Sequence, residues 1–191
     1  LSVTVDSRRK FPASLLLKAF GLKDNTGILT AFGGRIVDVE MTGNELEGRL
    51  LGEDVLDSRG QVMFKACSRL SKEVIEQLWK QGRTIIKVWD VSSVFASAVD
   101  KEETNSVDEA LMEILRRMRP NEPVRIEAAR TYFEEQFMDV HRYTLGRVGR
   151  YKMNRRLGLN IAENEFLLTL DDLVRIVKGL VALRDTEEQN D

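Results

Sequence analysis

The sequence predicts an α+β fold, in which a helical lobe built from the two ends of the chain carries a β-rich insert in its middle. Apolar residues recur at helical spacing in residues 1–40 and again in residues 100–191. Residues 41–99 instead show short apolar runs separated by turn sequences, which is typical of strands and hairpins. The length of 191 residues suits one domain with a small insert of this kind.

The first part of the lobe is expected to contain one strand and two helices. Alternating residues predict a strand at residues 1–5. Pro12 suits the first turn of a helix, the apolar residues of 15–20 follow at helical spacing, and Gly21 is a typical stop. A second, short helix is expected at residues 26–32.

The β-type pattern, which begins at residue 35, just before the insert, predicts two strands, a hairpin and one helix. Residues 36–39, rich in β-branched side chains, predict the first strand, and a hairpin is expected within residues 50–64. Ser71 is a good N-cap for a helix that ends near Gly82. Residues 84–89 have the composition of a further strand.

The second part of the lobe is expected to be helical throughout. Ser106 and Glu109 have the spacing of a capping box, and an apolar helical face runs from there to Met118. Pro120 and Pro123 break this helix. Three further helices are expected, at residues 126–137, 145–156 and 169–180, and residues 169–172, TLDD, are expected to cap the last of them.

Residue counts exclude several classes of protein. The 29 Lys+Arg residues nearly cancel the 31 Asp+Glu residues, so the overall charge does not indicate an anionic partner. One cysteine, Cys67, cannot form an intramolecular disulfide, and with one histidine, His141, it excludes a zinc site built mainly from these residue types. No apolar run of about 20 residues is present, so no membrane partner is expected.

The start of the chain supports two expectations. It shows no signal peptide, which together with the single cysteine predicts a cytoplasmic protein. It also opens, without an initiating Met, on residues that already have the pattern of a strand. We therefore expect a piece of a longer polypeptide.

The sequence lacks the motifs of a self-standing enzyme. A Walker loop is missing, and no Gly-x-Gly-x-x-Gly follows a strand. The spacing indicates no partner for His141 in nucleophilic catalysis, and the helix dipole already explains Asp171 and Asp172 at the start of a helix. We therefore expect no catalytic residue, cofactor or metal ligand in this chain.

Basic residues cluster in three places, although the overall charge is balanced. Between Asp139 and Glu163 the sequence has no acidic residue. Guanidinium groups suit phosphate oxygens because their planar forks donate two hydrogen bonds at once. Helical spacing would place Arg147, Arg150 and Asn154 on one face. The three groups are Arg8, Arg9 and Lys10; Arg116, Arg117 and Arg119; and Arg142, Arg147, Arg150, Lys152, Arg155 and Arg156.

Spacing alone leaves two interpretations of these clusters open. They form a binding surface for a polyanion such as DNA, or they are the solvated basic face of a protein–protein adaptor domain that makes no DNA contact. The first interpretation depends on the separate clusters converging, in the folded chain, into one electropositive wall.

Several of these segments resemble the β subunit of bacterial DNA-directed RNA polymerase. Residues 6–13, DSRRKFPA, are similar to that family's Asp-Arg-Arg-Arg-Lys-hydrophobic-Pro stretch, and residues 118–123, MRPNEP, to its Met-Arg-Pro-Gly-Glu-Pro. Arg142-Tyr143, followed by VGRYKMN at residues 148–154, is similar to its Arg-Tyr…Val-Gly-Arg-Tyr-Lys-Met/Phe-Asn signature.

The resemblance is uneven along the chain. It spans most of residues 1–40 and 106–185, whereas residues 50–89 are only loosely similar to a variable external β module of the same region. Ser7 stands where the family has an arginine, which removes one potential phosphate or base contact. Asn121 stands where the family has a glycine, a mild change because asparagine tolerates left-handed conformations.

The resemblance implies a lobe of the β subunit that forms one wall of the main DNA channel and contacts downstream and non-template DNA. The implied partners are DNA, the α, β′ and ω subunits, and a σ factor. In the family, the segments that line the catalytic centre follow those matched here. The resemblance therefore implies that the chain is not catalytic by itself and that Mg²⁺ is needed only in the whole polymerase.

The resemblance also implies roles for individual residues. Asp6 would accept hydrogen bonds from the N1–H and N2–H₂ groups of an unstacked guanine. A salt bridge to Arg8 or a turn cap is the alternative for Asp6. Basic residues would bind phosphates, which positions the DNA without reading its sequence. The full set of expected DNA-contacting residues is Asp6, Arg8, Arg9, Lys10, Arg119, Arg142, Arg147, Arg150 and Lys152.

Overall fold

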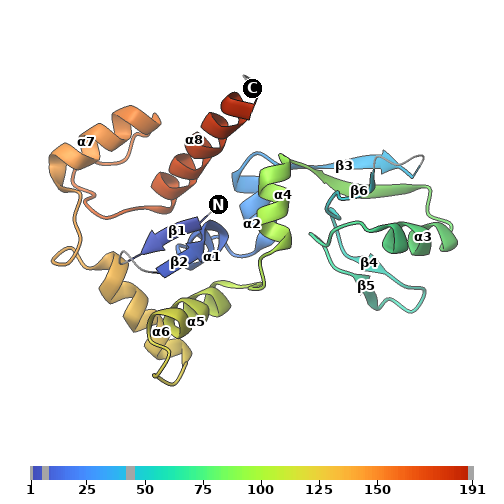
Figure 1. The fold of residues 1–191 in the computed structure, drawn as a ribbon, viewed down its shortest axis with the longest axis horizontal. Coiled ribbons are helices and arrows are strands. Elements are labelled where there is room, and N and C mark those ends of the chain that lie inside the picture. The colour runs from blue at the N-terminus through green and yellow to red at the C-terminus, as the bar shows by residue number, and fades with distance from the viewer. Residues whose placement is uncertain (1, 6–8, 42–45, 189–191) are drawn as a thin grey trace. The chain divides into compact units, whose positions relative to one another are not determined.

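The computed structural model describes residues 2–5, 9–41 and 46–188 and confirms the expected α+β class (Figure 1). The chain divides into two compact units. One, here called the helical unit, consists of Leu1–Asp24 and Glu103–Asp191. The other, the insert unit, is Asn25–Glu102. The lobe was expected to extend to residue 40, whereas the strand at residues 35–40 belongs to the insert unit, where its pairing partner lies.

The helical unit opens with a hairpin, of which only the first strand was expected. Strands β1 (Ser2–Val5) and β2 (Arg9–Pro12) pair antiparallel, with Val3 opposite Phe11. Strand β2 was not expected, because a run of cations before Pro12 does not have the composition of a strand. Pro12 is the N-cap of helix α1 (Ala13–Ala19) rather than its first residue.

The remaining helices of this unit begin close to the expected residues. They are α5 (Val107–Met118), α6 (Ile126–Phe133), α7 (Gly146–Leu157) and α8 (Leu170–Glu188).

The capping box at the start of α5 is confirmed with one adjustment. The Oγ of Ser106 accepts a hydrogen bond from the Glu109 N–H at 3.2 Å. The Glu109 carboxylate reaches the N–H of Asn105 at 2.7 Å, one residue before the N-cap. The helix expected at 126–137 changes character at residue 134, where α6 gives way to a π-helical turn, η2 (Glu134–Met138).

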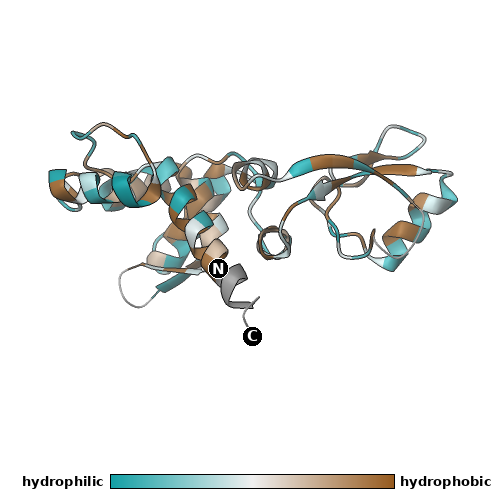
Figure 2. Ribbon diagram, turned by 90° about the horizontal axis from the view of Figure 1, so that it is seen from above, coloured by the Kyte–Doolittle hydropathy of each residue, from teal (hydrophilic) through white to brown (hydrophobic). Residues whose placement is uncertain are grey.

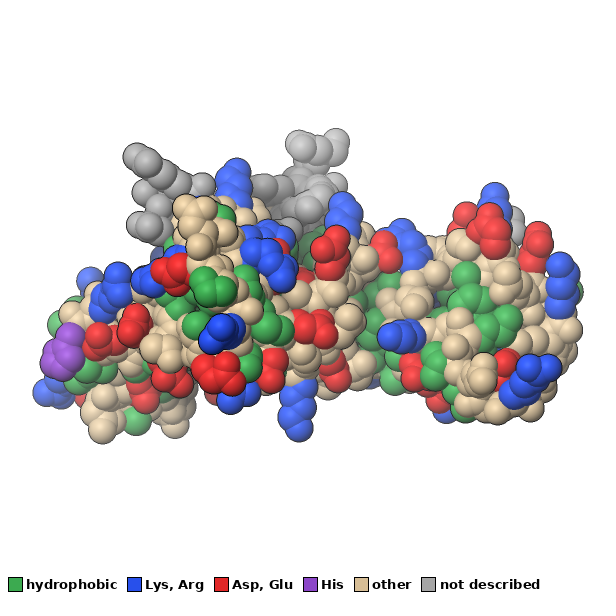
Figure 3. All heavy atoms as spheres, turned by 90° about the horizontal axis from the view of Figure 1, so that it is seen from below, with side chains coloured by type: hydrophobic (Ala, Val, Ile, Leu, Met, Phe, Trp, Pro, Cys, Tyr) green, Lys and Arg blue, Asp and Glu red, His purple; other side chains and the backbone are tan. Residues whose placement is uncertain are grey.

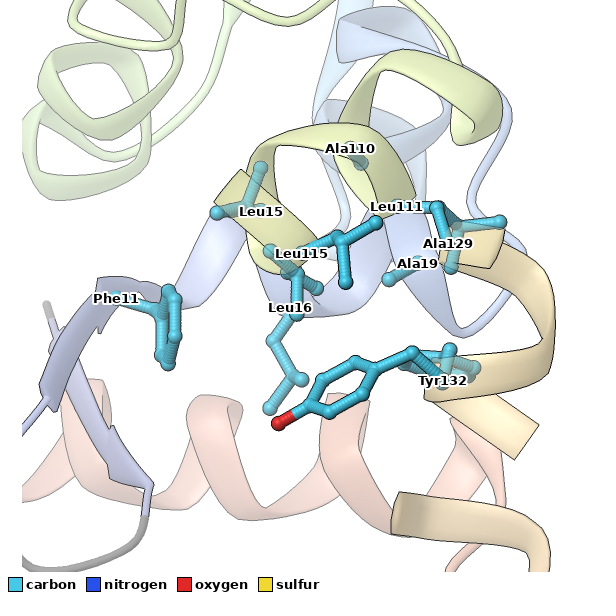
Figure 4. Packing of buried hydrophobic residues seen from close by; sticks show 11 residues of the cluster. Phe11, Leu15, Leu16, Ala19, Ala110, Leu111, Leu115, Ala129 and Tyr132 are labelled. Atoms are coloured by element: carbon cyan, nitrogen blue, oxygen red, sulfur yellow. The ribbon is translucent and has the colours of Figure 1, made fainter. Parts of the chain in front are cut away.

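The core of the helical unit lies between β2, α1, α5 and α6, as the labelled side chains of Figure 4 show. Leu15, Ile114 and Leu115 are at most 2% exposed there. Ring–ring contacts extend the core toward η2, with the Phe20 and Phe133 centroids 5.2 Å apart.

A buried polar contact joins the two segments of the helical unit. Lys18 on α1 is fully buried. Its ammonium group donates to the backbone carbonyl of Thr104, and the Thr104 hydroxyl lies 3.4 Å away. This contact ties α1 to the chain just before α5.

The insert unit is built around two antiparallel strand pairs. Strand β3 (Arg35–Glu40) pairs with β6 (Ile85–Asp90), and β4 (Val55–Leu56) pairs with β5 (Val62–Phe64). Helix α3 (Lys72–Lys80) has the expected cap, in which the Ser71 hydroxyl accepts from the Val74 N–H at 3.4 Å. A separate apolar core fills this unit, formed by Met41, Leu46, Leu51, Val55, Leu70, Leu78, Ile86 and Val88.

Two further helices belong to the insert unit. Helix α2 (Asn25–Ala31) was expected, whereas α4 (Ser93–Asp100) was not. Serine and valine in the α4 segment have only modest helix propensity, so local sequence did not indicate it. The helix forms in contact with α2, where the rings of Phe32 and Phe95 stack with centroids 4.2 Å apart. Within the described ranges, no helix has both the length and the apolar character needed to cross a membrane.

Replacing Leu115 with alanine tests the core of the helical unit. Leu115→Ala is expected to lower the free energy of unfolding of the chain by about 2–5 kcal/mol, because a cavity replaces a close-packed side chain. The control is Leu180→Ala on α8, a leucine that is 53% exposed, with an expected change of about 0.5 kcal/mol or less. Urea denaturation followed by circular dichroism measures both, and equal losses would contradict this assignment of the core.

Candidate nucleic-acid interface

Helix α7 carries the largest of the expected basic clusters. Its sequence, GRVGRYKMNRRL, contains no acidic residue, and Figure 2 shows it mostly in hydrophilic or intermediate colours. The helix ends at Gly158, whose φ of 64° is left-handed and suits glycine. Arg155 and Arg156 in the last turn are favoured there by the helix dipole.

The structure corrects the role expected for Arg150. This residue is completely buried, with its guanidinium turned toward the start of α8. The Nη1 group of Arg150 donates to both carboxylate oxygens of Asp172, at 2.7 and 2.9 Å. The Nε group donates to the carbonyl of Glu165 at 2.7 Å, and Nη2 donates to the carbonyl of Leu167. Arg150 is therefore a structural residue and leaves the set of candidate DNA contacts.

Asp172 serves a second purpose at the same place. Its Oδ2 accepts hydrogen bonds from the N–H and the hydroxyl of Thr169, both at 2.9 Å. The Thr169 hydroxyl oxygen accepts in turn from the Asp172 N–H at 3.2 Å. This reciprocal arrangement confirms the cap expected for α8. We call the ion pair and its hydrogen bonds to Glu165, Leu167 and Thr169 the Arg150 anchor.

The expected basic face of α7 is therefore divided, with Arg150 and Asn154 turned inward and Arg147 exposed. Asn154, which shares this face with Arg150, donates from Nδ2 to the carbonyl of Ile161 at 2.7 Å. Both side chains hold the segment between α7 and α8. Sequence reasoning missed this role, because Asp172 lies 22 residues beyond Arg150 and no local pattern connects them.

Two other expected contacts are exposed arginines that form ion pairs. Arg119 lies 3.0 Å from the Glu122 carboxylate, and its guanidinium carbon is 4.8 Å from the centre of the Tyr132 ring. Arg147 lies 3.3 Å from Glu163, and both side chains are more than half exposed. Exposed pairs of this kind contribute about 0–1 kcal/mol, so these arginines can exchange a carboxylate for a phosphate at little cost.

A further set of cations has no side-chain partner among the described residues. Arg9 and Lys10 lie on β2, and Arg142 lies in the segment between η2 and α7. Lys152 is exposed on α7. Asp6 and Arg8 lie outside the described residues, so their expected roles remain predictions.

The convergence of all basic clusters into one wall is not visible on the face drawn in Figure 3. Lys and Arg side chains are interspersed there with Asp and Glu side chains. The basic residues that helical spacing does bring together are Lys152, Arg155 and Arg156 on α7. Among the described side chains, no three His, Cys, Asp or Glu residues form a group that could hold a metal ion.

Arg150→Met tests the anchor. The change leaves the buried Asp172 carboxylate without its cation, so the free energy of unfolding is expected to fall by about 3–5 kcal/mol. The matched control is Arg147→Met on the same helix, whose pair is exposed and which should cost about 0–1 kcal/mol. Urea denaturation measures both changes. A small loss for Arg150→Met, equal to that of the control, would rule out a structural role for the anchor.

The comparisons with known proteins agree with the resemblance found in the sequence. Residues 61–191 match the family model described as RNA polymerase Rpb2, domain 2. Curated proteins named DNA-directed RNA polymerase subunit beta are similar over nearly the whole chain. The relative from Rhodopirellula baltica is 33% identical to this chain over 98% of its length. The relative from Fusobacterium nucleatum is 30% identical over the same share of the chain, 98%. The relative from Protochlamydia amoebophila is 31% identical over 95%.

The match covers only a small part of each relative. The chain spans 16% of the first of these relatives, 18% of the second and 15% of the third. Both the family model and the curated relatives nevertheless identify the same type of subunit. The chain belongs to the family of DNA-directed RNA polymerase β subunits.

Proposed function

We propose that this chain is a lobe of an RNA polymerase β subunit that forms part of the wall of the main DNA channel. In this proposal it contacts downstream and non-template DNA during transcription and contributes no catalytic residue. The observation that carries the proposal is the outward face of α7, where Lys152, Arg155 and Arg156 are exposed with no described carboxylate as partner.

The chemistry of these cations supports a phosphate contact. From residue 140 to residue 162 the chain has no acidic side chain, so the local potential is positive although the net charge is −2. Contacts to phosphates hold DNA in place without reading its sequence, which is what a channel wall requires. The candidate contacts are Arg9, Lys10, Arg119, Arg142, Arg147, Lys152, Arg155 and Arg156, with Asp6 and Arg8 retained from the sequence analysis.

The proposal assigns the remaining functions to the rest of the enzyme. The chain acts together with the α, β′ and ω subunits and a σ factor, in the cytoplasm. Nucleotidyl transfer requires Mg²⁺ held by carboxylates near the substrate phosphates. In this proposal that site belongs to other parts of the polymerase, and the chain needs no cofactor.

One observation favours the alternative of a protein–protein adaptor. The insert unit exposes several large apolar side chains, among them Trp79 at 59%, Ile85 at 55% and Val62 at 48%. Exposed apolar groups are typical of surfaces that contact other proteins where they adjoin one another in a patch. The two functions are compatible if the insert unit contacts protein and the helical unit contacts DNA.

The DNA contact is tested by Arg142→Gln in the assembled polymerase. Loss of one phosphate contact is expected to weaken promoter binding and to reduce the magnitude of the slope of log affinity against log salt by about 0.9. The open complex should also have a shorter lifetime. The control is Arg59→Gln in the turn of the insert hairpin, which removes the same charge from an exposed residue. If both variants bind DNA with the wild-type salt slope, the adaptor alternative is favoured instead.

A further inference from the structure

The outer side of α7 combines apolar and basic side chains. Val148 is 68% exposed and Tyr151 is 55% exposed. Steps of three and four residues place them on one helical face together with Lys152 and Arg155. We call these four residues the α7 outer stripe.

The Arg150 anchor explains why the stripe faces outward. A helix turns by about 100° per residue, so each of the four side chains lies about 100–160° around the helix axis from Arg150. Because Arg150 is held completely inside the unit by Asp172, the opposite side of α7 must point away from the interior. The exposure of Tyr151 and Val148 is thus imposed by the fold.

The composition of the stripe distinguishes between possible partners. Lysine is depleted at protein–protein interfaces, whereas here Lys152 shares the face of the exposed ring with Arg155, and neither cation has a described partner. The phosphates of duplex DNA would contact only the two cations of the stripe. The bases of a duplex are stacked on one another, so an aromatic side chain cannot stack on them. Aromatic rings next to basic residues are typical of surfaces that bind single-stranded nucleic acid, where a base stacks on the ring and the cations follow the backbone.

We propose that the α7 outer stripe binds unpaired DNA, with a base stacked on the ring of Tyr151 and the neighbouring phosphates held by Lys152 and Arg155. Val148 extends the apolar surface beneath the base. This inference rests on the proposed function and makes it more specific, because it assigns single-stranded DNA to this helix and names the residue that contacts a base.

The experiment compares two DNA probes in the assembled polymerase. One is a duplex with an unpaired bubble that carries 2-aminopurine, whose fluorescence reports stacking, and the other is the same duplex fully paired. Tyr151→Leu keeps an apolar side chain but removes the ring. It is expected to weaken binding of the bubble probe by about 5-fold or more, as loss of one stacked base does, and to leave duplex binding within about twofold.

Three further variants make the outcome specific. Tyr151→Phe keeps the ring and should restore bubble binding. Tyr143→Leu is the matched control, because this tyrosine is 44% exposed but lies outside the stripe, and it should bind both probes as the wild type does. Lys152→Gln should reduce the magnitude of the salt slope for the bubble probe by about 0.7, the value for one phosphate contact on a single strand.

The outcomes separate this inference from the function on which it rests. Wild-type bubble binding by Tyr151→Leu, with a reduced salt slope for Lys152→Gln, would overturn the stacking role and leave the DNA contact standing. Wild-type behaviour of both variants would count against the inference and the DNA contact of α7 together. If Tyr151→Leu instead prevents assembly of the polymerase and Tyr151→Phe does not, the stripe is a protein interface and the inference is overturned.

Discussion

The orientation of α7 depends on one buried ion pair. Removing a guanidinium and a carboxylate from water costs several kcal/mol for each ion, and the attraction between them offsets this only when the remaining hydrogen-bonding groups are also satisfied. Here Arg150 donates to Asp172 and to two backbone carbonyls, while Asp172 also caps α8. The same pair thus joins two helices and the segment between them, and it decides which side of α7 meets the solvent.

Burial, rather than position in the sequence, decides which cations of the helical unit can bind a phosphate. Arg150 is internal, Arg119 and Arg147 form exposed pairs, and Lys152 is free among the described residues. Only the exposed paired arginines and the free lysine can bind a phosphate at a small cost in free energy. The overall charge of −2 therefore gives no indication of α7, a helix whose charged side chains are all cationic.

Each of the two units has its own apolar core. The helical unit is packed around α1, α5 and α6, and the insert unit around the β3–β6 pair and α3. Because the cores are separate, side chains of the insert can vary without disturbing the packing that orients α7. This agrees with the uneven resemblance to the family, which is strong at the motifs of the helical unit and loose over residues 50–89.

The sequence by itself determined the α+β class, the capped starts of α3, α5 and α8, and membership in the β-subunit family. These features depend on residues close together in the chain, such as Thr169 and Asp172, so local spacing is sufficient to recognise them. Only the tertiary structure decided that β2 pairs with β1, that α4 forms beside α2, and that Arg150 is internal while Tyr151 is exposed. The hairpin is local, but the cations before Pro12 do not have the composition of a strand. The other outcomes depend on contacts between segments far apart in the chain, and helical spacing specifies which residues share a face but not which face is buried.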